Sequence, residues 1–495
     1  MVAVPPPVKG WNTRDALDAM EPEDAITLDN WFPRESDVVT RNGYAEHCDT
    51  TEAADVGSLW EYAAGTTRKL LAFVNGKIID VSTDTPSSLA TGYSTDIHYA
   101  ANFGGKLFGG TGADAPWDYD GSSIANTSWS GSGLTISNLI YPFVFKSRLY
   151  WIEKDTANFW YGGVGAITGT LTKFALETLQ SVASLGGHLV SLGSITRDGG
   201  DGEDDLFCAF MSTGQVVIYQ GTDPSDATKW GMVGIFNIGA LISRKTVLKV
   251  GADLVVATSD GYIPISSILR VGKTGNTRFA LSDKIQGAAR DAASRFMDND
   301  GWDLCLYPGG SMLIVNVPTS ELEVVQHVMN TRTGAWCRFT GMHAHCWATF
   351  DGELYFGGTD GVVYQADTGT TDLGEEINAD AQTAWNYFGN RGALKRWTAV
   401  RPVMVAPDLS IALGTDFDEI LTPSTSIITT EVSGGLWDEA EWDDGEWSST
   451  PNPETRWRST RGIGYCSSLR VVASTDDEQI RWLSTSYTME SGGLL

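Results

Sequence analysis

Basic side chains are scarce in this sequence. Its 495 residues include 34 Lys and Arg against 62 Asp and Glu, which gives a formal net charge of −28. Proteins that read nucleic-acid sequence normally present a basic face to the phosphates. The charge therefore argues against a sequence-reading nucleic-acid binder, and it leaves open a protein that nucleic acid passes without adhering.

The sequence also has no long apolar run and few cysteines. No apolar segment approaches the roughly 18 residues that span a bilayer, and Met1–Val4 leads directly into Pro5–Pro7, unlike a signal peptide. These features predict a soluble protein made inside a cell. The six cysteines are scattered without paired spacing, which predicts buried thiols in a reducing compartment: Cys48, Cys208, Cys305, Cys337, Cys346 and Cys466.

Recognisable catalytic motifs are lacking as well. The sequence contains neither a GxSxG elbow nor an HExxH pair, and none of its six histidines lies in a motif that supplies a general base. Gly272-Lys273-Thr274 ends like a phosphate loop, but Ser267 stands where the first glycine is needed. We therefore expect no enzyme activity, no catalytic residues and no cofactor.

Two kinds of metal site are weakly suggested. The acidic turns at 201–205 and 298–303 offer oxygens to Ca²⁺, but Gly309 occupies the twelfth position of the second, where a calcium loop needs glutamate. The run His343-Ala344-His345-Cys346 follows Cys337, which a four-ligand zinc site would need to fold in. Solvated turns and a partly buried strand explain these residues better, so we expect no metal.

Glycine and aromatic residues, in contrast, are abundant. There are 55 Gly, 18 Trp, 16 Tyr and 18 Phe, and 42% of the residues are hydrophobic. Many glycines among aromatic and β-branched residues indicate short strands joined by tight turns. The composition predicts an all-β protein with a large core.

A strand–turn–strand unit recurs within residues 57–375. The clearest examples contain Asn75-Gly76 and Asp360-Gly361, dipeptides that accept positive φ in a two-residue hairpin turn. The repeat spacing of roughly 30 to 55 residues is typical of propeller blades, and we predict a β-propeller of six or seven blades. A long β-sandwich or two barrels is the alternative. Seven units are visible: Leu70–Asp80, Lys106–Gly121, Arg148–Gly162, Leu206–Gly221, Leu254–Ile265, Leu304–Phe339 and Leu354–Asp367.

Residues 1–56 differ from this repeat. Five prolines and few apolar residues predict an extended N-terminal arm, with one short helical turn at 21–30. Trp11, Trp31 and Phe32 are costly to leave in water, so we expect them to anchor the arm on a partner surface.

Residues 376–495 predict a C-terminal β-sandwich or platform domain. A helical piece near 379–388 precedes strands at 398–405, 410–413, 469–472 and 479–487.

A carboxylate-rich run in this domain repeats tryptophan every five residues, and basic residues elsewhere in the domain offer a counterpart of opposite charge. We expect assembly contacts between subunits through Trp437, Trp442, Trp447, Lys395, Arg396, Arg456 and Arg458. Packing within one sandwich is the alternative.

Four stretches resemble one family of virion proteins. They are PPPVKGWNTR (5–14), DAITLDNWFP (24–33) and VTRNGY (39–44) at the start, and YCSSLRVV (465–472) near the end. They resemble the tail nozzle or hub proteins of short-tailed bacteriophages, known also as tail tubular protein B and packaged-DNA stabilisation protein. The family pattern has a mostly extended leader that ends in R-x-G-Y before the first blade.

That resemblance implies a structural protein of the virion tail, made in the cytoplasm of the host bacterium. It implies a homohexameric ring below the portal and the tail adaptor, next to tail fibre, spike or needle proteins. The ring would retain packaged DNA and pass it during ejection without sequence-specific binding, and an acidic lumen would repel the duplex. A propeller-type tail protein that binds or hydrolyses host glycans is the alternative.

Overall fold

The computed structural model describes residues 1–176, 186–196, 205–271, 280–320, 323–405, 408–420, 456–475 and 478–491. Strands predominate, and the α-helices in these ranges are α1 (Ile265–Val271) and α2 (Gln286–Phe296). Neither helix is long and apolar enough to cross a membrane, in the part of the chain that is described. The predicted all-β class is confirmed.

The chain folds as two compact units. Unit 1 contains Met1–Ala45, His327–Gly341 and Asp367–Leu495, and unit 2 contains Glu46–Gln326 and Met342–Ala366. The expected boundaries at 56/57 and 375/376 therefore do not coincide with the observed ones. The chain passes between the units four times.

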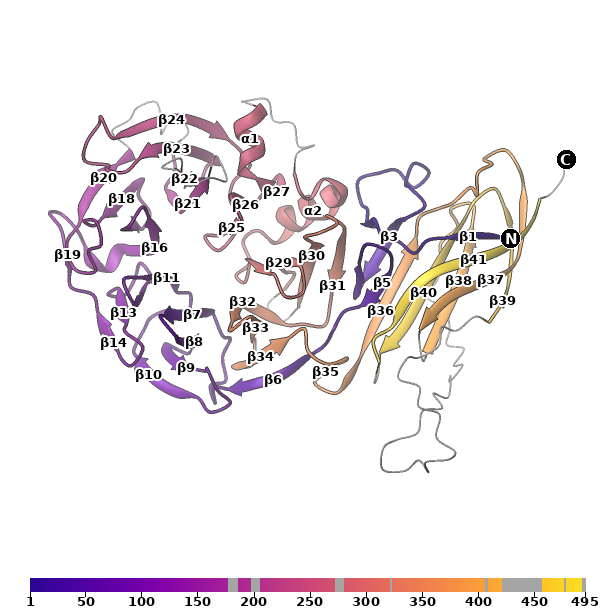
Figure 1. Ribbon diagram of the computed structural model, residues 1–495, viewed down its shortest axis with the longest axis horizontal. Helices are drawn as coiled ribbons and strands as arrows, with labels where there is room; N and C mark the ends of the chain where they lie inside the picture. The colour runs from indigo at the N-terminus through magenta and orange to yellow at the C-terminus, as the bar shows by residue number, and fades with distance from the viewer. Residues whose placement is uncertain are drawn as a thin grey trace. The chain divides into compact units, whose positions relative to one another are not determined.

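Unit 2 is a β-propeller with seven blades in a ring (Figure 1). The seven repeat units of the sequence each supply one blade, so the larger of the two predicted blade numbers is correct. Blade 1 has β7 (Ser58–Ala64), β8 (Thr67–Val74), β9 (Lys77–Asp80) and β10 (Ser87–Thr91). Blade 2 has β11 (Tyr99–Phe103), β12 (Lys106–Gly110), β13 (Trp117–Tyr119) and β14 (Ile124–Asn126). Blade 3 has β16 (Leu139–Phe145), β17 (Arg148–Glu153), β18 (Asn158–Tyr161) and β20 (Thr172–Ala175), with the short parallel pair β15 (Trp129–Ser130) and β19 (Gly169–Thr170).

The other four blades follow the same antiparallel pattern. Blade 4 has β21 (Leu189–Thr196), β22 (Asp205–Met211), β23 (Gln215–Gly221) and β24 (Trp230–Asn237). Blade 5 has β25 (Val247–Val250), β26 (Asp253–Thr258) and β27 (Gly261–Pro264), followed by α1. Blade 6 begins with β28 (Asp303–Tyr307), β29 (Met312–Pro318) and β30 (Val324–Asn330), and the chain enters unit 1 within β30. Blade 7 has β32 (Ala344–Phe350), β33 (Glu353–Gly358), β34 (Val362–Ala366) and β6 (Tyr44–Asp49).

The two-residue hairpin turn forms as predicted at Asn75-Gly76, whereas the hairpin at Asp360-Gly361 has a longer loop in which Gly361 has a φ of 82° and Asp360 does not have a positive φ. Val74 pairs with Lys77 across the turn between β8 and β9, where Asn75 and Gly76 have φ values of 50° and 67°. Positive φ at both central residues is the type I′ geometry, which matches the twist of the two strands.

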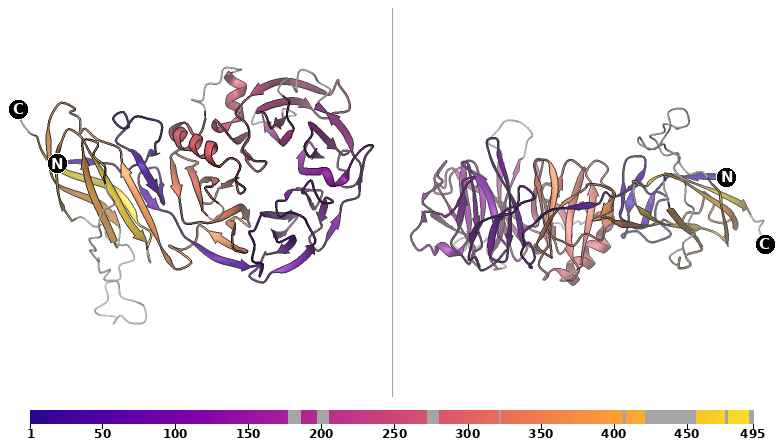
Figure 2. Two further views of the ribbon diagram at one scale, coloured as in Figure 1. Left: turned by 180° about the vertical axis from the view of Figure 1, so that it is seen from behind. Right: turned by 90° about the horizontal axis from the view of Figure 1, so that it is seen from below.

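The aromatic residues fill the spaces between blades. Phe145, Tyr150 and Phe159 of blade 3 pack with Phe207 and Trp230 of blade 4 in one buried cluster. Similar clusters join blade 1 to blade 7, blade 4 to blade 5, blade 1 to blade 2, and blade 2 to blade 3. Neighbouring blades therefore hold each other through their facing apolar surfaces, and Figure 2 shows the same ring of unit 2 from behind.

The ring closes through a strand from near the N-terminus. The last repeat supplies β32, β33 and β34 of blade 7. Strand β6 completes this blade by lying beside β34. The backbone N–H of Thr50 donates to the Gly361 carbonyl, and the Cys346 thiol donates to the Val56 carbonyl. Residues 46–56 are thus part of the propeller, and the expected free arm is wrong for this segment.

Unit 1 is built from two β-sheets, shown in Figure 1. The first contains β39 (Arg458–Gly464), β37 (Lys395–Val405), β41 (Arg481–Ser491), β5 (Val38–Thr40) and β4 (Trp31–Pro33), with β1 (Val2–Val4) on β41. The second contains β38 (Asp408–Thr415), β40 (Ser467–Thr475), β36 (Glu375–Thr383) and β3 (Asp24–Asp29). Beside β3 lie β2 (Gly10–Trp11) and β31 (Trp336–Phe339), and β35 (Thr371–Asp372) pairs with β36.

Two predicted helical pieces are strands instead. Residues 24–29 form β3. Residues 379–383 are the end of β36, and residues 384–388, which follow it, are not helical. Strand β36 pairs with β3 on one side and with β40 on the other. Its alternate residues Ile377, Ala379 and Ala381 are fully buried, so tertiary pairing outweighs the helix propensity of alanine.

The segment that carries the R-x-G-Y pattern is a tight internal junction of unit 1. Arg41 forms a two-pronged ion pair with Asp372, with Nη1–Oδ1 and Nη2–Oδ2 distances of 2.8 and 2.5 Å. A Cβ at Gly43 would lie 1.8 Å from the Thr371 carbonyl oxygen, so any side chain there collides with backbone. The glycine of the pattern is therefore required by a close approach of two chain segments.

We expect Gly43→Ala to destabilise unit 1 by several kcal/mol, because the clashing atom belongs to rigid backbone. Chemical denaturation followed by circular dichroism measures the change. Gly231→Ala is the control, since an added Cβ there meets nothing within 4 Å and should change stability by under about 0.5 kcal/mol. Equal effects of the two substitutions would contradict the required close approach.

Candidate functional site

The three aromatic residues of the expected arm lie in the core of unit 1. Trp31 is fully buried and stands edge-on to Trp482, and Phe32 is also buried. The Trp11 indole N–H donates to the Ile26 carbonyl at 3.0 Å. These side chains are shielded from water by other residues of the same chain and need no partner surface. Trp11, Trp31 and Phe32 are therefore not docking residues.

The basic residues of unit 1 divide into buried and exposed members. Lys395 is buried, and its ammonium donates to the carbonyls of Asn390, Ala393 and Tyr465 at 2.5, 3.0 and 2.9 Å. Lys395 is therefore an internal clamp and cannot contact a partner. Arg396 is exposed.

Near the start of β39, one basic residue is again exposed and another is bonded within unit 1. Arg456 is exposed, and Arg458 donates to the Leu409 carbonyl at 2.6 Å. The exposed ring of Trp457 carries the guanidinium of Arg401 at 4.9 Å. Trp437, Trp442 and Trp447 lie outside the described residues.

We expect Lys395→Met to cost roughly 2–4 kcal/mol of stability, because three carbonyl oxygens lose a charged donor in a buried site. Arg396→Met is the matched control on the next residue, and it should cost under about 0.5 kcal/mol. Thermal and urea denaturation of both variants measure the difference. If Lys395→Met left the stability unchanged, Lys395 would not be an internal clamp.

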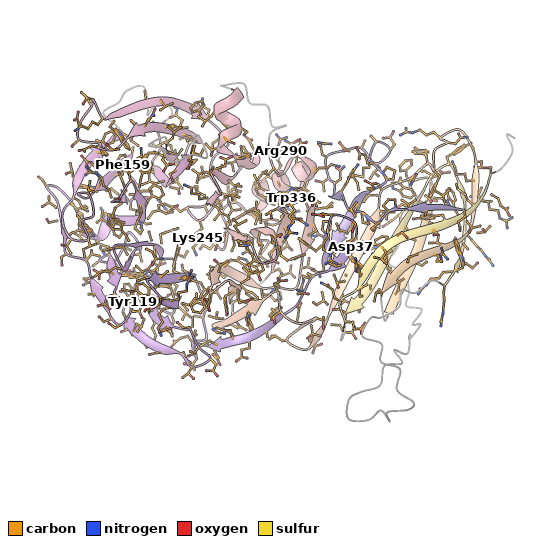
Figure 3. The ribbon with its side chains drawn as sticks, in the orientation of Figure 1. Asp37, Tyr119, Phe159, Lys245, Arg290 and Trp336 are labelled. Atoms are coloured by element: carbon orange, nitrogen blue, oxygen red, sulfur yellow. The ribbon has the colours of Figure 1, made fainter. Side chains whose placement is uncertain are left out.

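A second candidate site lies at the axis of the propeller. Arg244 and Lys245 precede β25, the first strand of blade 5, and Figure 3 shows Lys245 near the centre of the ring, with Tyr119 and Phe159 out in the blades. The Lys245 ammonium donates to the Gly57 carbonyl at 2.9 Å and to Ser58 Oγ at 3.2 Å. Arg244 Nη1 donates to the carbonyls of Leu189 and Val190. Lys245 therefore ties blade 5 to blade 1 across the axis, and Arg244 ties it to the neighbouring blade 4.

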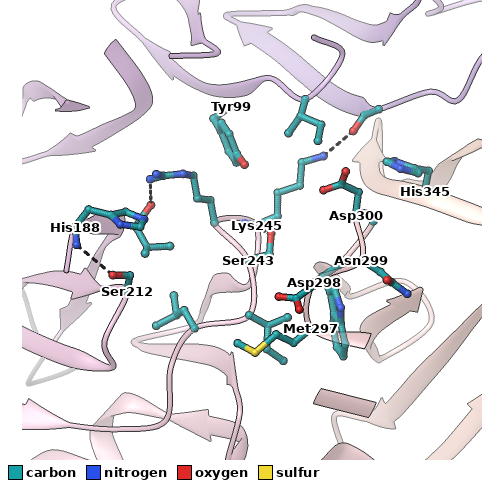
Figure 4. Close-up of a pocket in the computed structure, with 18 residues that line it drawn as sticks. Tyr99, His188, Ser212, Ser243, Lys245, Met297, Asp298, Asn299, Asp300 and His345 are labelled. Carbon is teal, nitrogen blue, oxygen red and sulfur yellow. Dashed lines mark hydrogen bonds between the residues drawn. The ribbon is translucent and has the colours of Figure 1, made fainter. Parts of the chain in front are cut away.

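These two cations line two cavities. The first, about 380 Å³, is lined by His188, Ser243, Asp298, Asp300 and His345 besides the cations (Figure 4). The second, about 560 Å³, has a mostly apolar and aromatic wall. Tyr99 also lines both cavities.

The acidic and imidazole groups around the axis are perturbed by burial. Burial raises the pKa of the Asp303 carboxyl to about 6, while its oxygens accept from the backbone N–H groups of Leu304 and Trp347. Burial, assisted by the charge of Lys245, lowers the pKa of His345. His345 Nδ1 is buried and has no hydrogen-bond partner among the described residues.

The weak metal motifs do not form a ligand cluster in the described part of the chain. No three His, Cys, Asp or Glu side chains there come together as metal ligands. Cys337 and Cys346 are both buried, and each donates to a backbone carbonyl. The turn at 201–205 is described only at Asp205, and Gly272-Lys273-Thr274 lies outside the described residues. The predicted burial of all six thiols is confirmed.

The axial cations were missed by sequence reasoning. A signal is present, because two adjacent basic residues directly precede the first strand of a repeat in a strongly acidic chain. The first strand of a propeller blade lies nearest the axis, so these side chains reach it. Motif searching does not detect such a placement, since it depends on the closure of the ring.

Comparisons with known proteins do not identify a family or a function. No protein-family model matches the sequence, and no curated protein does either. Among solved structures, Sqt1 of Saccharomyces cerevisiae has 10% identity and a TM-score of 0.40, covering 66% of this chain and 99% of its own. BamB from Moraxella catarrhalis has 12% identity and a TM-score of 0.34, covering 68% and 95%. Likeness at this level carries no information on function.

Proposed function

We propose that the chain is a structural subunit of the tail nozzle of a short-tailed bacteriophage. The observation that carries the proposal is the location of the four stretches that resemble the nozzle family. The first three contain β2, β3, β4 and part of β5, the fourth contains part of β40, and all belong to unit 1. Residues from both ends of the chain thus share one folded unit, which supports an architectural role for these stretches.

The charge of the chain supports a role beside DNA that does not involve binding it. Six copies carry on the order of −170, taking six times the formal −28. Duplex DNA carries about one negative charge per 1.7 Å, so an acidic lumen repels it. The repulsion acts within a Debye length of about 8 Å at physiological salt. Packaged DNA would be retained by a physical constriction and would slide without friction from phosphate contacts.

In this proposal the assembly contacts of the ring lie on unit 1. Unit 1 supplies the contacts between copies in a homohexamer and with the adaptor above it, with Arg396 and Arg456 as exposed basic candidates. The ring would also contact the fibre, spike or needle proteins of the tail. The assembled ring would belong to the virion tail after synthesis in the host cytoplasm.

We expect the full chain, alone or with its neighbouring tail proteins, to form a six-membered ring detectable by native mass spectrometry and negative-stain microscopy. The ring should bind duplex DNA negligibly at about 150 mM salt in a fluorescence titration, because the excess of acids leaves few cations for phosphates. Submicromolar DNA binding with a salt slope of several units would contradict the proposal. A chain that stays monomeric with its tail partners and binds host glycans would favour the alternative function.

A further inference from the structure

The axial cations of the propeller have unused binding capacity. Arg244 commits Nη1 to two carbonyls, and its Nε and Nη2 have no hydrogen-bond partner within the described ranges. No carboxylate of those ranges lies within ion-pair distance of Arg244 or Lys245. Burial lowers the pKa of the Arg244 guanidinium, because desolvation disfavours its charged form. Arg244 and Lys245 are both half-buried, and charges withdrawn from water are normally paired, so the site favours an anion.

The free edge of Arg244 has a particular chemistry. Nε and Nη2 point in parallel from one side of the planar guanidinium, and this pair matches the two oxygens of a carboxylate. Lys245 lies next to it in the chain and lines the same two cavities. A carboxylate at Arg244 would therefore also feel the field of the ammonium.

The carboxylates near the wider cavity are engaged elsewhere. Glu61 pairs with Arg68 at 2.6 Å, and the Asp303 oxygens accept two backbone N–H groups. Asp298 and Asp300 are exposed and line the other cavity. Lys249 adds a third positive charge to the wider cavity, whose charged lining is thus net basic.

The wall of the wider cavity is suited to an apolar body. Trp60, Tyr99, Tyr141 and Phe143 contribute rings, and Leu304 and Val247 contribute aliphatic surface. Tyr141 holds a φ of 55° beside a β-bulge in β16, an unusual conformation for a bulky residue. Such strain costs on the order of 1–3 kcal/mol and tends to mark binding sites. Here it occurs at a residue that lines the cavity.

We propose that the wider axial cavity binds an organic carboxylate with an aromatic or branched aliphatic body. The carboxylate pairs with the Nε–Nη2 edge of Arg244, and the body packs against Trp60, Tyr99 and Phe143. The cavity volume of about 560 Å³ accommodates a small molecule or the C-terminal residue of a peptide. This inference does not depend on the proposed tail function.

The test is a calorimetric titration of the full chain with 3-phenylpropionate at a constant ionic strength of about 150 mM. We expect saturable binding with a dissociation constant of about 1 mM or tighter. The neutral 3-phenylpropanamide and inorganic phosphate should bind at least about tenfold more weakly. The amide lacks the negative charge, and phosphate lacks the apolar body. A short peptide ending in phenylalanine distinguishes a peptide source from a free acid.

Three variants locate the site. Arg244→Gln should weaken 3-phenylpropionate binding at least about tenfold, because the positive charge is lost. Arg244→Lys should also weaken it, because lysine keeps the charge but lacks the paired Nε and Nη2 donors. Lys229→Gln, an exposed lysine of blade 4, should leave binding unchanged. No saturable binding to the wild-type chain, or equal binding of the acid and its amide, overturns the proposal without reference to any variant. Unchanged binding by a folded Arg244→Gln variant overturns it as well.

Discussion

A buried guanidinium connects the distant segments from which unit 1 is built. All five N–H donors of Arg41 have acceptors: Asn30 Oδ1, the carbonyls of Asn42 and Thr340, and both oxygens of Asp372. Asn30 extends the network, since its amide donates to Thr340 Oγ1 and to the Asn378 carbonyl. Strand β5 then pairs with β41, and β3 pairs with β36. The start, the middle and the end of the sequence therefore share one hydrogen-bonded centre.

That arrangement explains which parts of the fold were predictable. The propeller could be read from the sequence, because each blade is made from neighbouring strands and its turns carry local signals such as Asn75-Gly76. Unit 1 could be read only at its long C-terminal strands. Strands β3, β5 and β6 each pair with a strand that lies more than 300 residues further along the chain, and no local pattern reports such pairing. The prolines and sparse apolar residues of 1–56 therefore looked like a free arm.

The candidate sites show the same limit. The tryptophans of the N-terminal segment were correctly recognised as needing apolar surroundings, but their partners, such as Trp482, come from the other end of the chain. Lys395 was grouped with Arg396 because both are basic, although strand alternation points one inwards and the other outwards. Arg244 and Lys245 acquire their roles only when seven blades close around an axis. Function read from residue type alone misses roles that ring closure and strand direction create.

A double-mutant cycle on Arg41 and Asp372 tests the central claim most directly. Arg41→Met and Asp372→Asn should each lower the free energy of unfolding by about 3 kcal/mol or more, because each leaves a buried partner uncompensated. The double variant should cost clearly less than the sum, which gives a coupling energy of at least about 1 kcal/mol. Small and additive effects would contradict the account, since the two ends of the chain would then be held together without this pair.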